Sequence, residues 1–144
     1  MANFNRRLFC VATLATLVGC GGGPDYPIAP VHGVVSIDGK PLEGGRLMFA
    51  PVAAPGALKS GKPGFADIDA DGSYAVGTYA DQDGAVVGEH WVSLINLDPK
   101  SPAGQRIKAE RVTVPNRVTV VDGQDNQIVI ELTTQQIKQH GQFK

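Results

Sequence analysis

The sequence predicts an all-β protein: an antiparallel Greek-key β-sandwich of about seven strands, preceded by an N-terminal signal helix. Two observations lead to this class. Short stretches with alternating apolar and polar residues recur along the chain, and turn-forming dipeptides separate them. The 144 residues also include 18 Gly and 10 Pro, which favours many turns and few long helices. A closed barrel is the main alternative.

The charge of the chain argues against one class of partner. With 13 Lys and Arg against 14 Asp and Glu, the formal net charge is -1, and both signs are mixed along the sequence. Nucleic acids and anionic membrane surfaces are bound through concentrated basic patches. We therefore expect no nucleic-acid partner.

Residues 1–19 are typical of an export signal. Arg6 and Arg7 provide the charged start, and an uncharged apolar run follows over residues 8–18. This run is too short to span a bilayer, so it indicates a signal and not a transmembrane helix. The arginine pair fits either the general or the twin-arginine export route.

The signal ends in Leu-Val-Gly-Cys at residues 17–20, which resembles the lipobox of bacterial lipoproteins. The resemblance implies cleavage between Gly19 and Cys20 and attachment of acyl chains such as palmitate to Cys20. Two or three chains are enough for stable membrane anchoring. Because Gly21 follows the cysteine where an inner-membrane retention signal has Asp, we expect the outer membrane of a bacterial cell envelope. An ordinary secretory signal with a chance cysteine is the alternative.

Cleavage would also remove Cys10, so the mature chain would have no disulfide. Residues 20–30 are glycine-rich and then proline-spaced, which predicts a flexible tether between the lipid and the domain. A first strand is expected over residues 31–37, followed by a turn at Asp38 and Gly39. Residues 46–50 should form a second strand antiparallel to the first, and residues 52–63 a long surface loop.

The central element of the predicted domain is a β-hairpin within residues 64–79. Two short alternating runs flank Asp71 and Gly72, a dipeptide that accepts the positive φ angles of a tight turn. This hairpin and the strands around it place the folded domain at residues 31–133.

Three further strand regions follow the hairpin. Residues 89–97 have apolar side chains on both faces, which predicts a central strand. Residues 112–120 predict one kinked strand or two strands around Pro115, and residues 127–133 show the clearest alternation in the sequence. Residues 98–104 break the pattern. Residues 134–144 are polar and without a period, so we expect a frayed C-terminal tail.

Three motifs in this order give the domain a family resemblance: GVVSIDGKPLEGG at residues 33–45, DADGSY at 69–74 and GEHWVSL at 88–94. Together they resemble the carboxypeptidase regulatory-like domain, a transthyretin-like β-sandwich of the same broad class as immunoglobulin folds. The resemblance covers residues 33–132 and implies that fold. Its motifs consist of turn and core residues, so it implies no particular chemistry.

One metal hypothesis comes from the hairpin. Asp67, Asp69, Asp71 and Gly72 match positions one, three, five and six of a calcium-binding loop. Position twelve holds Thr78, where such loops have a bidentate Glu, and helical patterns are missing on both sides. The alternative is that the strand and turn place three aspartates on one exposed face without a metal.

Aromatic and histidine residues offer fewer signals. Trp91 could stack on a carbohydrate if Val92 is buried, or it could cover the edge of the core. His32, His90 and His140 are far apart and lack metal-binding spacing, so we expect solitary histidines at the surface or at strand edges.

The serines have no motif partner, and no Gly-x-Ser-x-Gly elbow or glycine-rich phosphate loop occurs. We therefore expect no enzyme and no cofactor. The prediction is a lipid-anchored structural or protein-interaction module of the bacterial envelope, facing the periplasm or the cell surface. Its partner would be an envelope protein or a glycan. The alternative is a calcium- or carbohydrate-binding surface module.

Overall fold

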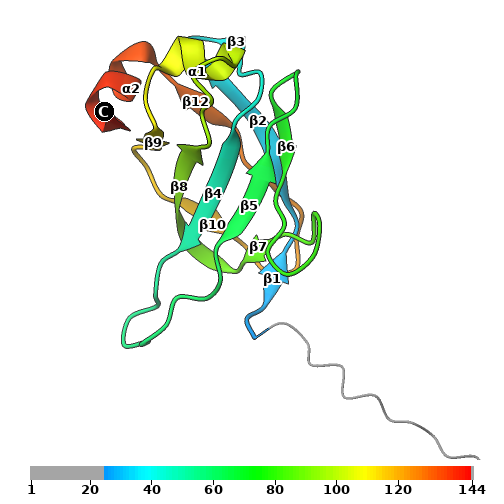
Figure 1. Cartoon of the computed structure of the whole chain (residues 1–144). Helices are drawn as coiled ribbons and strands as arrows, with labels where there is room; N and C mark the ends of the chain where they lie inside the picture. Colours follow the sequence, from blue (N-terminus) through cyan, green and yellow to red (C-terminus); the bar gives the residue numbers. More distant parts are fainter. Residues whose placement is uncertain (1–24, 144) are drawn as a thin grey trace, which may run out of the picture.

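The chain folds as two β-sheets that enclose a common apolar core in the computed structural model, which describes residues 25–143 (Figure 1). The predicted all-β class is confirmed. The first sheet has the order β5-β4-β8-β9-β13, and β10 also pairs with β8. Its strands are β4 Arg46–Pro51, β5 Gly64–Asp67, β8 Gly88–Ile95, β9 Arg111–Thr113, β10 Val118–Val120 and β13 Gly141–Gln142.

The second sheet is built around β2. One edge of this strand pairs antiparallel with β3 and β6, and the other edge pairs with β11 and β12. A separate two-stranded sheet joins β1 and β7. The bounds are β1 Ile28–Ala29, β2 Val31–Ile37, β3 Lys40–Pro41, β6 Ser73–Ala75, β7 Ala85–Val86, β11 Asn126–Gln127 and β12 Ile130–Leu132.

The expectation of a wholly antiparallel sandwich was wrong, because β11 and β12 run parallel to β2. The chain leaves β10 in the first sheet and crosses to the second, where it enters at the same end as β2. The backbone N–H of Ile128 then donates to the carbonyl of His32 at 2.9 Å, and that of Asp38 donates to Leu132 at 2.9 Å. A crossover between sheets allows the parallel direction that a tight hairpin would exclude.

The expected pairing of the second strand with the first was also wrong. β4 lies between β5 and β8 in the first sheet, whereas β2 belongs to the second. Gly44 and Gly45 have φ angles of +85° and +95° and turn the chain out of the short β2–β3 hairpin. The buried Leu42 lies just before this change of sheet.

The predicted hairpin at residues 64–79 forms at both ends but opens in the middle. Phe65 and Gly77 exchange backbone hydrogen bonds of 2.9 and 2.8 Å, and the N–H of Asp69 donates to Ser73 at 2.9 Å. Between these points β5 pairs with β4, and β6 pairs with β2. The hairpin therefore joins the two sheets. A turn forms where predicted, between Asp69 and Ser73, but only Gly72 takes a positive φ, of +85°; Asp71 does not.

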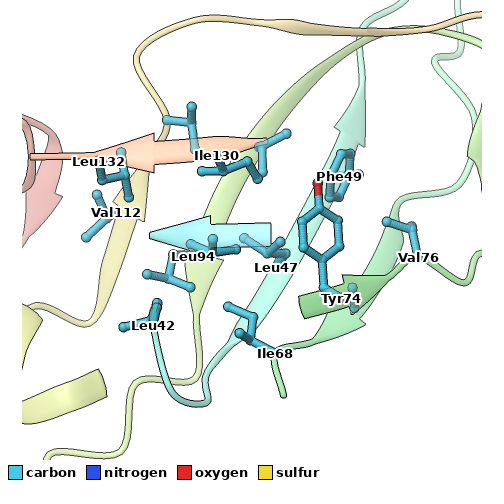
Figure 2. Packing of buried hydrophobic residues seen from close by; sticks show 14 of the residues in the cluster. Leu42, Leu47, Phe49, Ile68, Tyr74, Val76, Leu94, Val112, Ile130 and Leu132 are labelled. Carbon is cyan, nitrogen blue, oxygen red and sulfur yellow. The ribbon is translucent and has the colours of Figure 1, made fainter. Parts of the chain in front are cut away.

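The core lies between the sheets, and its side chains come from the alternating positions that the sequence indicates (Figure 2). Leu47, Phe49 and Leu94 of the first sheet meet Ile130 and Leu132 of the second, all at most 2% exposed. Such complete burial is the main source of stability in a domain of this size.

The Tyr74 side chain makes a hydrogen bond within the core region. Its hydroxyl donates to the carbonyl of Ile128 at 2.7 Å. Burial raises the pKa of Tyr74, so the phenol stays protonated and able to donate. Gly33 is required beside this contact, since a Cβ there would lie 1.8 Å from the same carbonyl oxygen. The carbonyl of Ile128 is thus fixed between β2 and β6.

The domain begins earlier than predicted, because part of the expected tether is folded. Ile28 and Ala29 form β1 and pair with Val86 and Ala85 of β7. Ala29 is buried, and Gly84 allows the close approach, since a Cβ there would lie 2.1 Å from the Ala29 carbonyl oxygen. The predicted signal, the predicted cleavage site between Gly19 and Cys20 and the predicted lipidation of Cys20 all fall outside the described residues.

The expectation of a frayed C-terminal tail was wrong. Thr134–His140 form helix α2, and β13 follows it and pairs with β9. A capping box starts the helix: the N–H of Gln136 donates to the Thr133 hydroxyl, and the N–H of Thr133 donates to the Gln136 side chain at 2.9 Å. Ile137, the one apolar residue of the helix, is 4% exposed and packs into the core.

A second helix, α1 Pro102–Ile107, occupies a region where the sequence predicts only a break in the strand pattern. Ser101 caps it by accepting a hydrogen bond from the N–H of Gly104 at 3.0 Å, and proline follows at the first helical position. Arg106 donates to the carbonyls of Ile37 and Pro41, which ties the helix to the β2–β3 turn. None of the helices within residues 25–143 is long and apolar enough to cross a bilayer.

The folded C-terminal segment gives a stability prediction. Ile137→Ala should lower the free energy of unfolding by about 2–5 kcal/mol, because it removes a buried side chain and leaves a cavity. Urea denaturation monitored by circular dichroism measures the change. Gln139→Ala, an exposed position of the same helix, is the control and should change stability by less than about 0.5 kcal/mol. Equal, negligible effects of both changes would mean that the segment is not docked.

Candidate functional site

The three aspartates of the calcium hypothesis are engaged by protein groups. The backbone N–H and the hydroxyl of Ser73 donate to Asp71 at 2.9 and 2.6 Å, and the same hydroxyl lies 3.4 Å from Asp69. The Ser73 hydroxyl, followed by its N–H, lowers the pKa of Asp71. Asp67 faces the Arg46 guanidinium at 3.7 Å. These partners give Asp69 and Asp71 a structural role in the turn, whereas Asp67 pairs across the neighbouring strands β4 and β5.

No three His, Cys, Asp or Glu side chains converge into a metal site anywhere in residues 25–143. The Asp-Gly-Ser sequence is typical of a turn in which an aspartate accepts hydrogen bonds from the following residues. The calcium hypothesis therefore receives no geometric support and stays a prediction.

A cavity of about 780 Å³ lies where β5 and β6 diverge, and we call it the hairpin groove. Two cations line it against aromatic rings: the Arg46 guanidinium lies 5.1 Å from the centre of the Phe65 ring, and the Lys62 ammonium 5.2 Å from that of Tyr79. The Arg46 Nε, which lies 3.7 Å from the Asp67 carboxylate, and the Tyr79 hydroxyl are buried and make no hydrogen bond. If a side-chain movement exposes them, such donors can bind a carbonyl, carboxylate or hydroxyl of a ligand.

The wall of the hairpin groove is a rigid loop. The Asp83 carboxylate accepts hydrogen bonds from the N–H groups of Thr78, Tyr79 and Ala80, the shortest at 2.7 Å. Burial acts to raise the pKa of Asp83, but these backbone donors outweigh it and lower the pKa. Sequence reasoning missed this groove, because Arg46, Lys62 and Tyr79 come from three separate segments.

Trp91 is half-exposed, at 41%, as the carbohydrate hypothesis requires, but its ring is not free. The Arg117 guanidinium lies 4.8 Å from the ring centre and is held by an ion pair with Glu89 at 3.1 Å. Glu89 and Trp91 belong to β8, and Arg117 directly precedes β10, which pairs with it. A sugar that stacks on this face would have to displace the arginine.

The contact between Arg117 and the Trp91 ring can be tested by tryptophan fluorescence. Trp91 is the single tryptophan of the chain, so its fluorescence reports on this place alone. Arg117→Ala should expose the ring and raise the rate at which acrylamide quenches its emission, because one face loses its cation. Arg111→Ala, an exposed arginine on β9, is the control and should quench like the wild type. Unchanged quenching in Arg117→Ala would contradict the contact.

The histidines lie apart, but one of them is not where the sequence suggests. His32 pairs with Asp125 at 3.0 Å at the surface, and His140 is exposed in α2. His90, in contrast, is fully buried, and its ring centre lies 6.1 Å from that of Phe49 in a T-shaped arrangement. The expectation of a surface or edge position was wrong for His90. Strand β8 begins at Gly88, which has a φ of +124°, and His90 is the first residue of this strand whose side chain is buried.

The surroundings of His90 favour the neutral ring. Its Nδ1 lies 3.1 Å from the carbonyl of Gly88, while its Nε2 is buried without a partner. Burial lowers the pKa of His90 from its usual 6.5, and the bond to Gly88 opposes this only in part. The unfolded chain therefore binds a proton at His90 at a higher pH than the folded chain does.

The buried histidine predicts how stability depends on pH. Because the folded pKa lies below 6.5, stability is complete above that pH and falls as pH drops below it. When the pH is lowered from about 7.5 to about 5.5, the free energy of unfolding should fall less in His90→Leu than in the wild type. The difference between the two proteins should be at most about 1.4 kcal/mol per pH unit, the limit for a single titrating group. Urea midpoints at both pH values measure this. Parallel pH profiles would show that His90 does not titrate on unfolding.

A second, apolar groove of about 340 Å³ lies at the end of the sandwich where the described chain begins. Its walls are Tyr26, the loop of residues 52–63 and the segment 86–89. The returning half of the loop packs on this end: a Cβ on Gly61 would lie 3.3 Å from the Tyr26 ring and 3.4 Å from Val86. Leu58, in the same loop, is fully exposed.

Comparisons with known proteins add little to this geometry. No protein-family model and no curated protein matches the chain. Among solved structures, it is similar to the crystal structure of a DUF3823 family protein from Parabacteroides merdae ATCC 43184, with a TM-score of 0.46 and 14% sequence identity. The match covers 76% of this chain and 46% of that chain, so this chain corresponds to less than half of that protein.

Proposed function

We propose that this protein is a lipid-anchored, non-enzymatic structural or protein-interaction module of the bacterial cell envelope. One observation carries the proposal: an arginine-initiated apolar run ends in Leu-Val-Gly-Cys at residues 17–20. The features of this signal occur in the required order, and each has a separate role in export, cleavage and acylation. Cys20 is the residue that would receive the lipid, and the outer membrane is the expected destination.

The position of the folded domain supports this proposal. β1 begins at Ile28, eight residues after Cys20, and pairs with β7. A lipid on Cys20 would therefore hold the sandwich close to the membrane by a short connection. Such a module acts by what it presents to neighbouring molecules.

The hairpin groove is the surface we propose for a partner, either an envelope protein or a glycan. The Arg46 Nε and the Tyr79 hydroxyl make no hydrogen bond within the described chain, although Nε lies 3.7 Å from the Asp67 carboxylate, and hydrogen bonds to Asp83 hold the wall of the groove in place. A donor without a hydrogen bond gains one when a ligand supplies an acceptor, which favours binding. Among the described residues, no geometric feature favours the calcium or Trp91 carbohydrate alternatives over this groove.

Lipidation is tested by labelling. Cells that express the full chain should incorporate labelled palmitate into the protein, and Cys20→Ala should abolish the label because it removes the acceptor thiol. Cys10→Ala is the matched control: it changes the only other cysteine and should leave labelling intact. Equal labelling of wild type and Cys20→Ala, or no label in the wild type, would refute the anchor.

A further inference from the structure

The loop of residues 52–63, between β4 and β5, extends from the body of the sandwich (Figure 1). It contains two lysines and no acidic residue. Leu58 is exposed at 102%, the value of a side chain without neighbours. Single exposed leucines are common on protein surfaces, so the meaning of this one depends on where the loop points.

The loop points toward the end of the molecule from which the anchor would come. Strand β1, near the start of the described chain, lies at this end, and both helices lie at the opposite end (Figure 1). Cys20 is five residues before Asp25, and five residues of extended chain span at most about 18 Å. A lipid on Cys20 would therefore keep this end of the domain within about 18 Å of the membrane surface.

The returning half of the loop is packed against the same N-terminal segment. Leu58, Lys59, Ser60 and Gly61 form a shallow pocket with Tyr26, the second described residue. The loop is thus attached to the stretch of chain that leads toward Cys20, and the two should approach the membrane together.

The charges near the loop tip suit phospholipid headgroups. Lys59, next to Leu58, is exposed, whereas Lys62 lies over the Tyr79 ring. Glu89, at the base of the groove beside the loop, is paired with Arg117. An exposed leucine beside an exposed lysine can insert the apolar side chain while the ammonium remains at the phosphates.

We propose that residues 52–63 form a membrane-contact loop, which rests on the same phospholipid bilayer that holds the acyl chains of Cys20. Leu58 enters the boundary between headgroups and acyl chains, and Lys59 contacts lipid phosphates. This contact fixes the orientation of the sandwich on the membrane, with the helices at the far end. The inference depends on the proposed lipidation of Cys20.

A fluorophore on the loop tests this contact in the full, lipidated protein. Acylation blocks Cys20 and cleavage removes Cys10, so Leu58→Cys provides a single thiol for an environment-sensitive dye. The protein is reconstituted in vesicles of phosphatidylethanolamine and phosphatidylglycerol. Emission of the dye should shift to the blue, and nitroxide-labelled lipids should quench it. Ala70→Cys, at the exposed turn far from the loop, is the control and should show neither effect.

A second variant tests the role of charge. Leu58→Cys combined with Lys59→Glu should lose part of the lipid quenching in vesicles with phosphatidylglycerol, because the carboxylate is repelled by anionic phosphates. In vesicles of phosphatidylcholine alone the loss should be smaller. Equal quenching of the two proteins in both vesicle types would overturn the assignment of Lys59 to phosphate contact.

The outcomes separate the loop contact from the anchor. Flotation with the vesicles, together with water-like emission at both dye positions, would overturn the loop contact while leaving the anchor in place. A blue shift without nitroxide quenching would indicate a second protein copy on the loop and would also overturn it. Failure of the protein to float would refute the anchor itself, and the loop contact with it.

Discussion

The rest of the fold depends on the division of one hairpin between two sheets. Residues 64–79 are paired at Phe65 and Gly77 and again at Asp69 and Ser73, while β5 and β6 separate in between to join β4 and β2. This separation fixes the spacing of the sheets at one edge. It also directs Tyr74 into the core, where it packs near Phe49 with ring centres 6.0 Å apart.

Two glycines allow the backbone segments to approach closely at the point where β5 and β6 separate. A Cβ on Gly64 would lie 2.7 Å from the Thr78 hydroxyl, and one on Gly77 would lie 2.5 Å from the carbonyl oxygen of Ala80. Larger residues would push the two strands apart, because the atoms they would meet belong to a tightly hydrogen-bonded loop. The hairpin groove results from the same geometry, because β5 and β6 leave a space at the surface where they diverge.

The two ends of the sandwich carry different elements. At the helical end, Thr134 donates to the Asp38 carboxylate and Arg106 to two carbonyls of the β2–β3 region. The Thr134 hydroxyl is the main cause of the lowered pKa of Asp38. The other end carries the two-residue strand β1 and the extended loop 52–63. In the orientation that we propose, the projecting loop faces the membrane and the helices lie at the far end.

Local periodicity and φ preferences were enough to predict the all-β class, the alternating core positions of β2, β4 and β12, the turn at Gly72 and the loop at residues 52–63. Local pattern also contained the Thr133 capping box, although the polar composition around Ile137 concealed the helix. The pairing of the strands, the parallel direction of β11 and β12 relative to β2, and the position of Arg117 over Trp91 could not be predicted. These features depend on contacts between segments far apart in the chain, and the free energy of such contacts is not encoded in the pattern of any one segment.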